Sequence, residues 1–438
     1  MNGIHTCLAW CAALAMTTGA LAQTTPANGP PLTLKDAEQL ALKNHPRVLE
    51  VQSEMLESSQ LVRETRAAYY PALSGVLTGS QGTRGGRIGS GALPASQLFD
   101  RFGQGVLVSQ LITDSGRTPN LVATSKLHAQ AIEQNYQATQ FDVLLGVNTS
   151  FFDVLRNQAL VRVAQETVSA RQLLSDQVST LAQNNLRSQL DVSFADVNVA
   201  DARLLLLTAQ NNLQDAYAQM AAALGTDRSV EYQLVDEPLP ANLPTDPNAL
   251  VGQAFANRPD VTRLKFERDA AYRFASAEGD LARPTVSAVG VAGFLPYINQ
   301  SATAAPVPGR YEGAAVIVEV PVLNGGLFAA RHTAADLRAR EADQQLRDVQ
   351  EGIARDVRVA WADATTAFQR MDVTAQFMRS AALAVDLAQG RYNLGLSSIV
   401  ELTQAQLNLT RAEIENLDAK YDYQSHYAAL QYTLGLLR

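Results

Sequence analysis

The chain has 438 residues with a formal net charge of −8, and 47% of its residues are hydrophobic. This length is enough for two or three ordinary domains. The negative charge argues against a nucleic-acid partner, because binding to a phosphate backbone requires a basic surface.

Residues 1–22 have the features of a signal peptide. An apolar run ends in the sequence Ala-Leu-Ala, which signal peptidase is able to cleave. The segment has no Lys or Arg, which is atypical, and the alternative is an apolar N-terminal core segment. Cys7 and Cys11 both lie in it, outside any convincing lipoprotein motif. We therefore predict a mature chain without cysteine and without a disulfide.

Residues 23–225 are predicted to form a first structural repeat. A helix is expected first, and after Pro71 the sequence changes to short residues with weak alternation, a pattern typical of β-strands. We predict strands at about 71–83 and 101–113, with a flexible glycine-rich loop between them. The remainder, 115–225, carries apolar or small residues three or four positions apart, which predicts two long helices in a hairpin.

Residues 226–246 form the predicted linker. The segment holds Pro238, Pro240 and Pro244, and Pro247 follows it, so a long helix is excluded there. We predict an irregular connection between two similar units. Outside the first 22 residues no uncharged apolar run reaches about 18 residues, so no transmembrane helix is predicted.

Residues 247–438 are predicted to form a second repeat, with strands at about 284–297 and 310–323 and a helical hairpin at 325–436. The first arm of this hairpin has an apolar stripe, and about sixty residues of helix span on the order of 90 Å, too long for one compact globule. The stripe breaks at Gly395. A glycine between two periodic runs indicates a left-handed turn.

The two repeats align with each other along the sequence. Apolar positions of the second hairpin fall on apolar positions 210 residues earlier, and Leu224-Gly225 matches Leu434-Gly435. Before the strands the offset is 213, as Pro71 and Pro284 show, so the first copy has three extra residues in its inter-strand loop. Two hairpins in register indicate an internal duplication rather than two unrelated coiled coils.

The sequence offers no group of residues typical of an enzyme or a metal site. The four histidines after residue 22 are scattered, and no H-E-x-x-H motif, Walker A loop or G-x-S-x-G motif occurs. The glycine-rich run 79–91 lacks the Lys-Ser/Thr that a phosphate loop needs. We therefore expect no catalysis, no cofactor and no metal, because an active site requires converging groups.

The informative polar residues are acidic and lie just beyond the two hairpin turns. Glu401 follows the second turn, and the offset places Asp191 after the first. An acidic residue in the first turn of a helix interacts favourably with the helix dipole and can act as a cap, which is one explanation. The alternative is a functional ring of carboxylates, and this requires several hairpins side by side.

The strands supply a reason for such a ring. Each predicted strand has about ten residues, the length of a tilted strand that crosses a bilayer. Aromatic residues lie near the strand ends, where an aromatic girdle and ordinary hairpin packing explain them equally well. Four strands cannot close a membrane barrel, whose smallest size is about eight, and lipid does not tolerate open edges. Membrane insertion therefore requires several copies of the chain to share one barrel.

Two segments resemble the TolC-like outer-membrane efflux protein family. The turn at 391–402 is similar to the family's R-Y-x-x-G-x-x-S/T-x-x-x-L pattern, and the opening at 32–46 is similar to the family's start. The resemblance covers essentially the whole mature chain. It implies a mainly α protein with transmembrane β: a homotrimer with a twelve-stranded barrel in the outer membrane of a Gram-negative bacterium. A periplasmic α-helical barrel would continue the β-barrel, with 226–246 as an equatorial belt.

The resemblance also implies a function. Members of the family are passive export ducts of tripartite multidrug efflux systems, surrounded by outer-membrane lipid. A periplasmic adaptor joins them to an inner-membrane pump of RND or ABC type. Small molecules are the expected cargo, and type I secretion of polypeptides is the runner-up, since the pump selects the cargo. A structural coiled-coil surface protein is the alternative of a different class, but such proteins run their helices in one direction.

Single positions carry over to the family's periplasmic gate and adaptor-docking tips. Tyr392 matches the tip tyrosine, and Asp191 and Glu401 match acidic positions near the narrowest point. Gln404 stands where some members have a second acidic residue, and Ser397 where a basic one occurs. The first copy has Asn185 at its turn, and asparagine tolerates the left-handed conformation. The expected docking tips are formed by Asn185, Leu186, Ser188, Gly395, Leu396 and Ser397.

Overall fold

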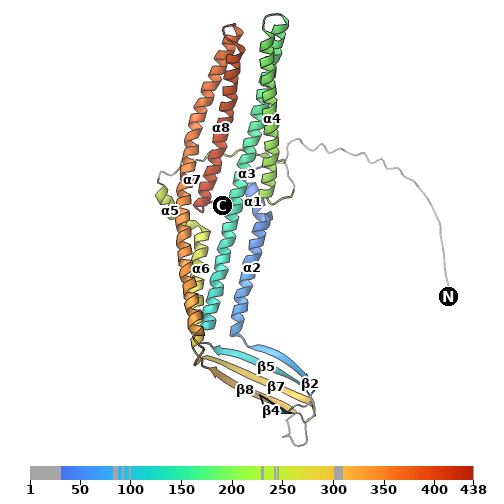
Figure 1. Ribbon diagram of the computed structural model, residues 1–438, viewed down its shortest axis with the longest axis vertical. Helices are drawn as coiled ribbons and strands as arrows, with labels where there is room; N and C mark the ends of the chain where they lie inside the picture. The colour runs from blue at the N-terminus through green and yellow to red at the C-terminus, as the bar shows by residue number, and fades with distance from the viewer. Residues whose placement is uncertain are drawn as a thin grey trace, which may run out of the picture.

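The computed structural model describes residues 31–81, 87–90, 93–97, 100–227, 231–240, 243, 246–299 and 309–437. The molecule is elongated, with two pairs of long helices at one end and a β-sheet at the other (Figure 1). In this described part, no helix combines the length and the apolar character needed to cross a membrane. The predicted signal peptide, 1–22, lies outside the described residues.

The two halves of the chain have the same order of main elements. The first half contains β1 (Pro31–Leu32), α1 (Leu34–Asn44), α2 (Pro46–Arg66), β2 (Ala72–Ser80), β3 (Arg87–Ser90), β4 (Leu93–Gln97), β5 (Asp100–Thr113), α3 (Arg117–Gln183) and α4 (Gln189–Ala223). The second half contains β6 (Gln233–Leu234), α5 (Pro247–Asn257), α6 (Pro259–Gly279), β7 (Thr285–Asn299), β8 (Arg310–Glu319), α7 (Leu327–Asn393) and α8 (Ile399–Thr433). Matching long helices have equal lengths, 67 residues in α3 and α7 and 35 in α4 and α8.

A proline separates the two short helices in each half. His45 and Arg258, which precede Pro46 and Pro259, have extended backbone with ψ of 122° and 124°. The cause is the proline ring, which disfavours the helical conformation of the residue before it. The His45 side chain also caps α2, because its Nδ1 accepts a hydrogen bond from the Arg47 N–H at 3.2 Å.

Strands β2, β5, β7 and β8 form one antiparallel sheet in that order. Within each half the two strands pair as the sequence predicted, β2 with β5 and β7 with β8. The pairing of β5 with β7 joins the two halves. This ladder shifts near Pro296, where Phe102 pairs with Tyr297 but Gln104 pairs with Phe294. Proline has no N–H to donate, so an extra residue is accommodated there.

Some strand boundaries differ from the predicted ones. β8 ends at Glu319 and not at 323, because Pro321 cannot donate to the ladder. β7 extends to Asn299, beyond the predicted end at 297. The glycine-rich segment that was expected to be a flexible loop contains a short antiparallel ladder of β3 with β4. Residues 82–86, in the same segment, lie outside the described part of the chain.

Most of the exposed large apolar side chains of the sheet share one face. Leu73 and Leu77 of β2 lie on that face with Val108 of β5 and Val316 of β8, and all four are exposed in the single chain. The opposite face includes smaller residues: Ser74, Gly105, Ser109, Ser287 and Gly293. The opposite face also carries the exposed Val76, Val291 and Ile317, so the two faces differ in how many large apolar side chains they present.

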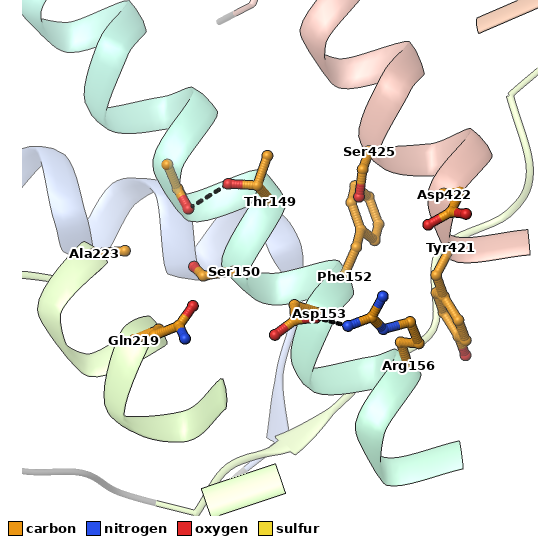
Figure 2. Close-up of a pocket in the computed structure, with 11 residues that line it drawn as sticks. Thr149, Ser150, Phe152, Asp153, Arg156, Gln219, Ala223, Tyr421, Asp422 and Ser425 are labelled. Atoms are coloured by element: carbon orange, nitrogen blue, oxygen red, sulfur yellow. Dashed lines mark hydrogen bonds and ion pairs between the residues drawn. The ribbon is translucent and has the colours of Figure 1, made fainter. Parts of the chain in front are cut away.

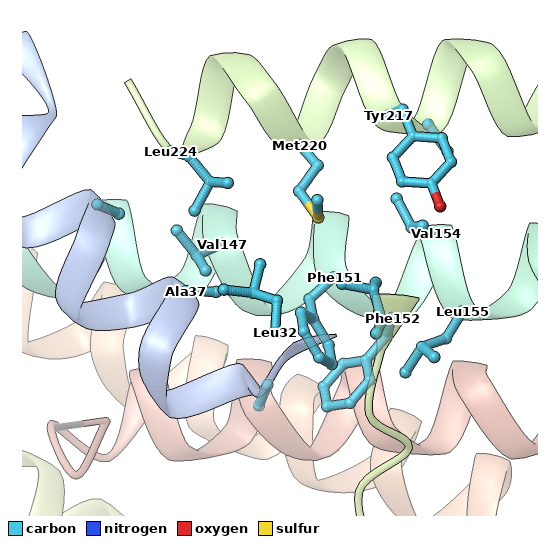
Figure 3. Close-up of a cluster of buried hydrophobic side chains, with 14 of the residues drawn as sticks. Leu32, Ala37, Val147, Phe151, Phe152, Val154, Leu155, Tyr217, Met220 and Leu224 are labelled. Carbon is cyan, nitrogen blue, oxygen red and sulfur yellow. The ribbon is translucent and has the colours of Figure 1, made fainter. Parts of the chain in front are cut away.

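The main core lies at mid-length, where the long helices pack on the shorter ones. In the first half Val147 and Phe151 of α3 pack with Met220 and Leu224 of α4 and with Leu32 of β1 (Figure 3). A second cluster lies between α5, α6, α7 and α8 and includes Leu250, Val261, Ile353, Val357, Leu430 and Leu434. The first cluster also includes Tyr421 and Ala428 of α8, so the second half packs on the first there.

Residues 231–240 of the linker are held against both halves. β6 pairs in parallel with β1, and each of these strands contributes a buried leucine to the first core. Asp236 forms an ion pair with Lys420 of α8, and the Gln424 amide of α8 donates to the Glu237 carbonyl at 3.0 Å. This part of the linker is therefore fixed although it has little regular structure.

Candidate functional site

The two helical hairpins end at the same end of the molecule, opposite the sheet (Figure 1). Asn185 and Gly395 each have a left-handed backbone at the tip, with φ of 56° and 72°. In both turns an N–H bonds at 2.9 Å to the carbonyl five residues earlier, as from Leu186 to Leu181. The two tips are thus the same Schellman-type helix end, and Asn185 adopts the conformation that the sequence predicted.

The two acidic positions beyond the turns have different partners. Asp191 closes a capping box: its carboxylate accepts from the Ser188 N–H at 3.3 Å, and the Ser188 hydroxyl accepts from the Leu190 N–H at 3.1 Å. Glu401 instead forms an exposed ion pair with Arg391 Nε at 3.0 Å. Within the described residues, no hydrogen bond or ion pair joins Asp191 to Glu401. The capping explanation therefore applies directly to Asp191.

Arg187 connects the two tips. Its Nη2 donates to the Tyr392 carbonyl at 2.8 Å, and its guanidinium carbon lies 4.2 Å from the centre of the Tyr392 ring. Because the face of an aromatic ring attracts a cation, this one side chain makes two contacts with the other hairpin. The residue 210 positions later is Ser397, whose hydroxyl is buried without a partner among the described residues.

The helical periodicity of the sequence does not identify Arg187 as a functional residue. The signal that identifies it is the difference between the two copies of the turn, since the first contains one basic residue and the second, 394–398, contains none. Its contact with Tyr392 crosses 205 positions of the sequence. No periodic pattern reveals a contact over that separation, and only the assembled hairpins bring the two residues together.

Tyr392 is the buried residue of the tip. It is 3% exposed, and its hydroxyl has no hydrogen-bond partner in the part of the chain that the structure describes. Burial raises the pKa of this hydroxyl, while the charge of Arg187 lowers it. The same cluster contains Leu174, Val178, Val192, Ala195, Ala388, Ile399 and Leu402 from both hairpins. Tyr392 therefore lies at the junction of the hairpins rather than on an outer surface.

The predicted docking positions lie mostly on the surface. Five of them are exposed: Asn185, Leu186, Ser188, Gly395 and Leu396. The two leucines are 70% and 67% exposed. Gln404 is also exposed, and its amide donates to Asn408 on the same helix at 3.3 Å. The tips thus present apolar side chains that another protein can cover.

A cavity of about 440 Å³ lies near mid-length between α3, α4 and α8 (Figure 2). The charged residues that line it have partners: Asp153 accepts from Arg156 at 2.6 Å, and Asp422 accepts from Arg370 at 3.1 Å. Burial raises the pKa of the neighbouring Asp418 carboxyl, whereas Arg156 lowers it. Because its charges are satisfied within the chain, this cavity is a weaker candidate site than the tips.

Two long helical hairpins joined to one antiparallel sheet are also the fold of several solved outer-membrane proteins. Crystal structures of CusC align with the chain at a TM-score of 0.78 and 20% identity, covering 92% of each chain. VceC from Vibrio cholerae aligns at a TM-score of 0.77 and 18% identity, covering 92% of this chain and 96% of that one. At these identities the comparison shows a shared fold.

The family model described as "Outer membrane efflux protein" matches residues 38–226 and 250–436. These segments make up most of the chain, which therefore belongs to this family and to the outer membrane, as the resemblance predicted. A curated relative is "Outer membrane efflux protein BepC" of Brucella suis, 23% identical over 89% of this chain and 82% of that protein. Another is "Cation efflux system protein CusC" of Escherichia coli, 24% identical over 85% and 81%.

Proposed function

We propose that three copies of the chain form a passive duct that carries small molecules out of the periplasm through the outer membrane. The four-stranded sheet carries this proposal. Its outer strands, β2 and β8, each pair on one side only within the described residues. Lipid does not tolerate unpaired edges, and a membrane barrel needs about eight strands or more. Three copies supply twelve strands and pair every edge.

The two faces of the sheet support this assembly. Leu73, Val108 and Val316 form an apolar band, while Gln104 and Arg310 lie on the same face towards the strand ends remote from the helices. An apolar band next to polar residues fits a bilayer core beside a polar interface. We infer that this face contacts lipid and that the opposite face, which has fewer large apolar residues and several serines and glycines, lines the duct.

The long helices support a tube that continues the barrel. Each of α3 and α7 has 67 residues, which corresponds to about 100 Å at the helical rise. Both leave the sheet on the same side (Figure 1). In a trimer six hairpins would stand side by side across the periplasm, with the linker 226–246 in a belt around them. The tips would then form the periplasmic entrance.

The partners proposed for this duct are a periplasmic adaptor at the tips and an inner-membrane pump, of RND or ABC type, that supplies energy. The exposed Leu186 and Leu396 provide six apolar tips per trimer for the adaptor. Relatives are described as a cation efflux protein, CusC, and as a solvent efflux protein, SrpC of Pseudomonas putida. Since similar ducts serve such different cargo, we assign cargo selection to the pump and no enzymatic step to the duct.

We assign the gate of the duct to Tyr392, Asp191, Glu401 and Gln404. In a trimer the two acidic residues would place six carboxylates around the entrance. Packing like charges together raises the cost of ionising all of them, and their negative potential attracts cations and repels anions. The ion pair of Glu401 with Arg391 weakens this potential, so we expect modest rather than strong cation selectivity.

Two measurements on the purified protein test the proposal. Mass analysis in detergent should give three chains, and the protein should conduct ions in planar bilayers. A monodisperse monomer that keeps its β-sheet signal would overturn the trimer. A trimer that never conducts would overturn the duct and favour the structural surface protein.

A further inference from the structure

A smaller cavity, of about 270 Å³, lies between the two hairpins where α3 and α4 face α8. Arg171 of α3 and Arg411 of α8 line it from opposite hairpins. Much of the remaining wall is apolar and includes Leu205, Leu407 and Ile414. The cavity therefore combines two arginines, two carboxylates (Asp201 and Glu415) and an apolar wall inside a single chain.

Arg171 is a buried cation with an unused donor. The residue is 5% exposed, and its Nε is buried without a hydrogen-bond partner among the described residues. Its Nη1 donates to the Asn198 carbonyl at 3.4 Å, near the upper limit for a hydrogen bond. A buried donor without an acceptor is costly, and more so in a charged group. The side chain thus lacks an acceptor on its Nε side.

The carboxylates at this cavity do not fill that place. Glu415 is held by Arg370, whose Nη2 donates to it at 2.7 Å. Asp201 is exposed, and although burial lowers the pKa of Arg171 and the charge of Asp201 raises it, Nε remains without a partner. Arg411 adds a second positive charge from the facing hairpin. The lining thus contains two arginines and two carboxylates, and Arg171 is the buried cation that keeps an unused donor.

The second half of the chain shows that packing does not require an arginine here. The residue 210 positions after Arg171 is Ala381, which is 6% exposed on α7. A small apolar residue therefore suffices at the matching place between helices. The burial of a cation in the first copy adds a cost that the second copy avoids, so a role in binding explains it better than a role in packing.

We propose that this cavity binds a small apolar carboxylate, with Arg171 as its anchor. A guanidinium presents a planar fork of N–H donors that matches the two oxygens of a carboxylate, and Nη1 is the one donor of Arg171 with a hydrogen bond among the described residues. Leu205, Leu407 and Ile414 then cover the apolar body of the ligand. The volume lies just below the range of about 300–1,000 Å³ for drug-sized ligands, so an aromatic acid of one ring or a short-chain acid fits.

A bound carboxylate bridges the two hairpins. Its head contacts Arg171 of the first hairpin, and its body contacts Leu407 and Ile414 of the second. The ligand would therefore oppose any separation of α4 from α8. This inference does not depend on the trimer or on transport, because every residue of the cavity belongs to one chain.

Calorimetric titration of the full chain in detergent with sodium benzoate tests the inference. Benzoate should bind at one site per chain, and Arg171→Gln should weaken binding at least tenfold. Benzyl alcohol, which has the ring but no carboxylate, should not bind at this site. Arg203→Gln is the matched control, because Arg203 is an exposed cation that bonds Gln172 on the neighbouring helix of the same hairpin. It should leave benzoate binding unchanged.

A second variant keeps the test valid if Arg171→Gln disturbs the fold. Leu205→Trp retains the arginine and fills the cavity, so it should also abolish benzoate binding. The inference is overturned if the parent protein does not bind benzoate, or if both variants bind it as the parent does. Equal binding of inorganic phosphate and benzoate would likewise overturn it, since a general anion site would not need the apolar wall.

Discussion

The two hairpin tips have the same backbone and different side chains. Asn185 and Gly395 hold the same left-handed conformation, and each turn is closed by the same bond across five residues. Asparagine is one of the few residues with a side chain that adopts this conformation readily. The comparison shows that a copy of the turn can lose its glycine without losing its shape, while the side chains around it diverge.

Because the side chains differ, the contact between the two tips is not symmetric. Arg187 of the first tip contacts Tyr392 of the second. At the 210-residue offset between the copies, Ser397 of the second tip corresponds to Arg187, and Ala182 of the first corresponds to Tyr392. Serine is too short to repeat the contact, and alanine offers no ring. In a ring of alternating hairpins, every second junction would then carry the Arg–Tyr contact. Hairpins would be joined in pairs, each pair within one chain.

The largest effect is expected from Gly395→Trp. A side chain in the left-handed conformation costs about 1–2 kcal/mol, and a large ring at the exposed tip blocks close approach of an adaptor. Export measured by accumulation of a fluorescent efflux substrate should be lost, while fractionation still finds the protein in the outer membrane. Asn185→Gly is the control. It places a glycine at the matching position of the first tip and preserves the left-handed turn there, so this variant should export normally. Full export by Gly395→Trp would exclude docking at this tip.

Tyr392→Ala should have the next largest effect. Removing a buried aromatic side chain costs about 3 kcal/mol or more, and this ring joins the two hairpins. Thermal unfolding should occur at lower temperature, and the duct should spend more time open in bilayer recordings. Tyr392→Phe is the control: the hydroxyl is buried without a partner among the described residues, so its loss should leave stability unchanged or raise it. Equal effects of the two changes would show that the hydroxyl is bonded.

An exchange between the copies sharpens the comparison. Arg187→Ser places in the first tip the residue type that the second tip has at Ser397. It removes both contacts with Tyr392, and the free energy of unfolding should fall by about 1–3 kcal/mol. Ser397→Arg should not restore them, because Ala182 offers no ring to an arginine from the second tip. Thermal unfolding of the two single variants and the double variant checks this. Recovery of the parent's stability in the double variant would mean that the two junctions are equivalent.

The residues that separate the two short helices in each half, His45 and Arg258, also differ in whether they change protonation at mildly acidic pH. Burial, followed by the charge of Arg47, lowers the pKa of His45 below its usual value of 6.5. The unfolded chain therefore binds the proton more tightly, and the stabilising cap of His45 is present above pH 6.5 and lost as the pH falls below it. The expected loss is about 1 kcal/mol or less. Arg258 holds the matching place in the second half and does not titrate.

His45→Asn isolates this effect. Asparagine supplies a cap that does not titrate in this range, so the variant should lose less stability than the parent between pH 8 and pH 5.5. Chemical denaturation at both pH values gives the two differences. If parent and variant lose the same amount, the acid sensitivity arises elsewhere in the chain.

The smallest effect is expected from Asp191→Asn with Glu401→Gln. If these residues form a gate, single-channel recordings should show reduced cation selectivity and loss of block by trivalent cations, with the fold intact. If they only stabilise their helices, stability should fall slightly, by about 0.3–1 kcal/mol for each negative charge lost at a helix start, and conductance should not change. Asp191→Asn alone separates the cap from the ion pair of Glu401 with Arg391. Selectivity and block like those of the parent would exclude an acidic gate.

The sequence predicts the parts of the fold that have repeated or local signals. The helical stripes, the strand pairs and the left-handed turn at Asn185 follow from periodicity and from the alignment of two copies. The partners of Arg187 and the lack of one at Arg171 depend on how segments about 200 positions apart are brought together. The sequence does not predict the β3–β4 ladder, because glycine-rich sequence weakens the alternation that marks a strand.

The pairing of β1 with β6 has a consequence for the order in which the chain folds. β1 (Pro31–Leu32) lies at the start of the first half, and its partner β6 (Gln233–Leu234) follows that half in the sequence. As the chain is synthesised from its N-terminus, α1 to α4 are made before β6. The first core, which contains both Leu32 and Leu234, is therefore incomplete until β6 has been added. Contacts between such distant segments form slowly, because a long loop must close first. A fragment that ends at α4 contains almost the whole first half, yet it should remain incompletely folded.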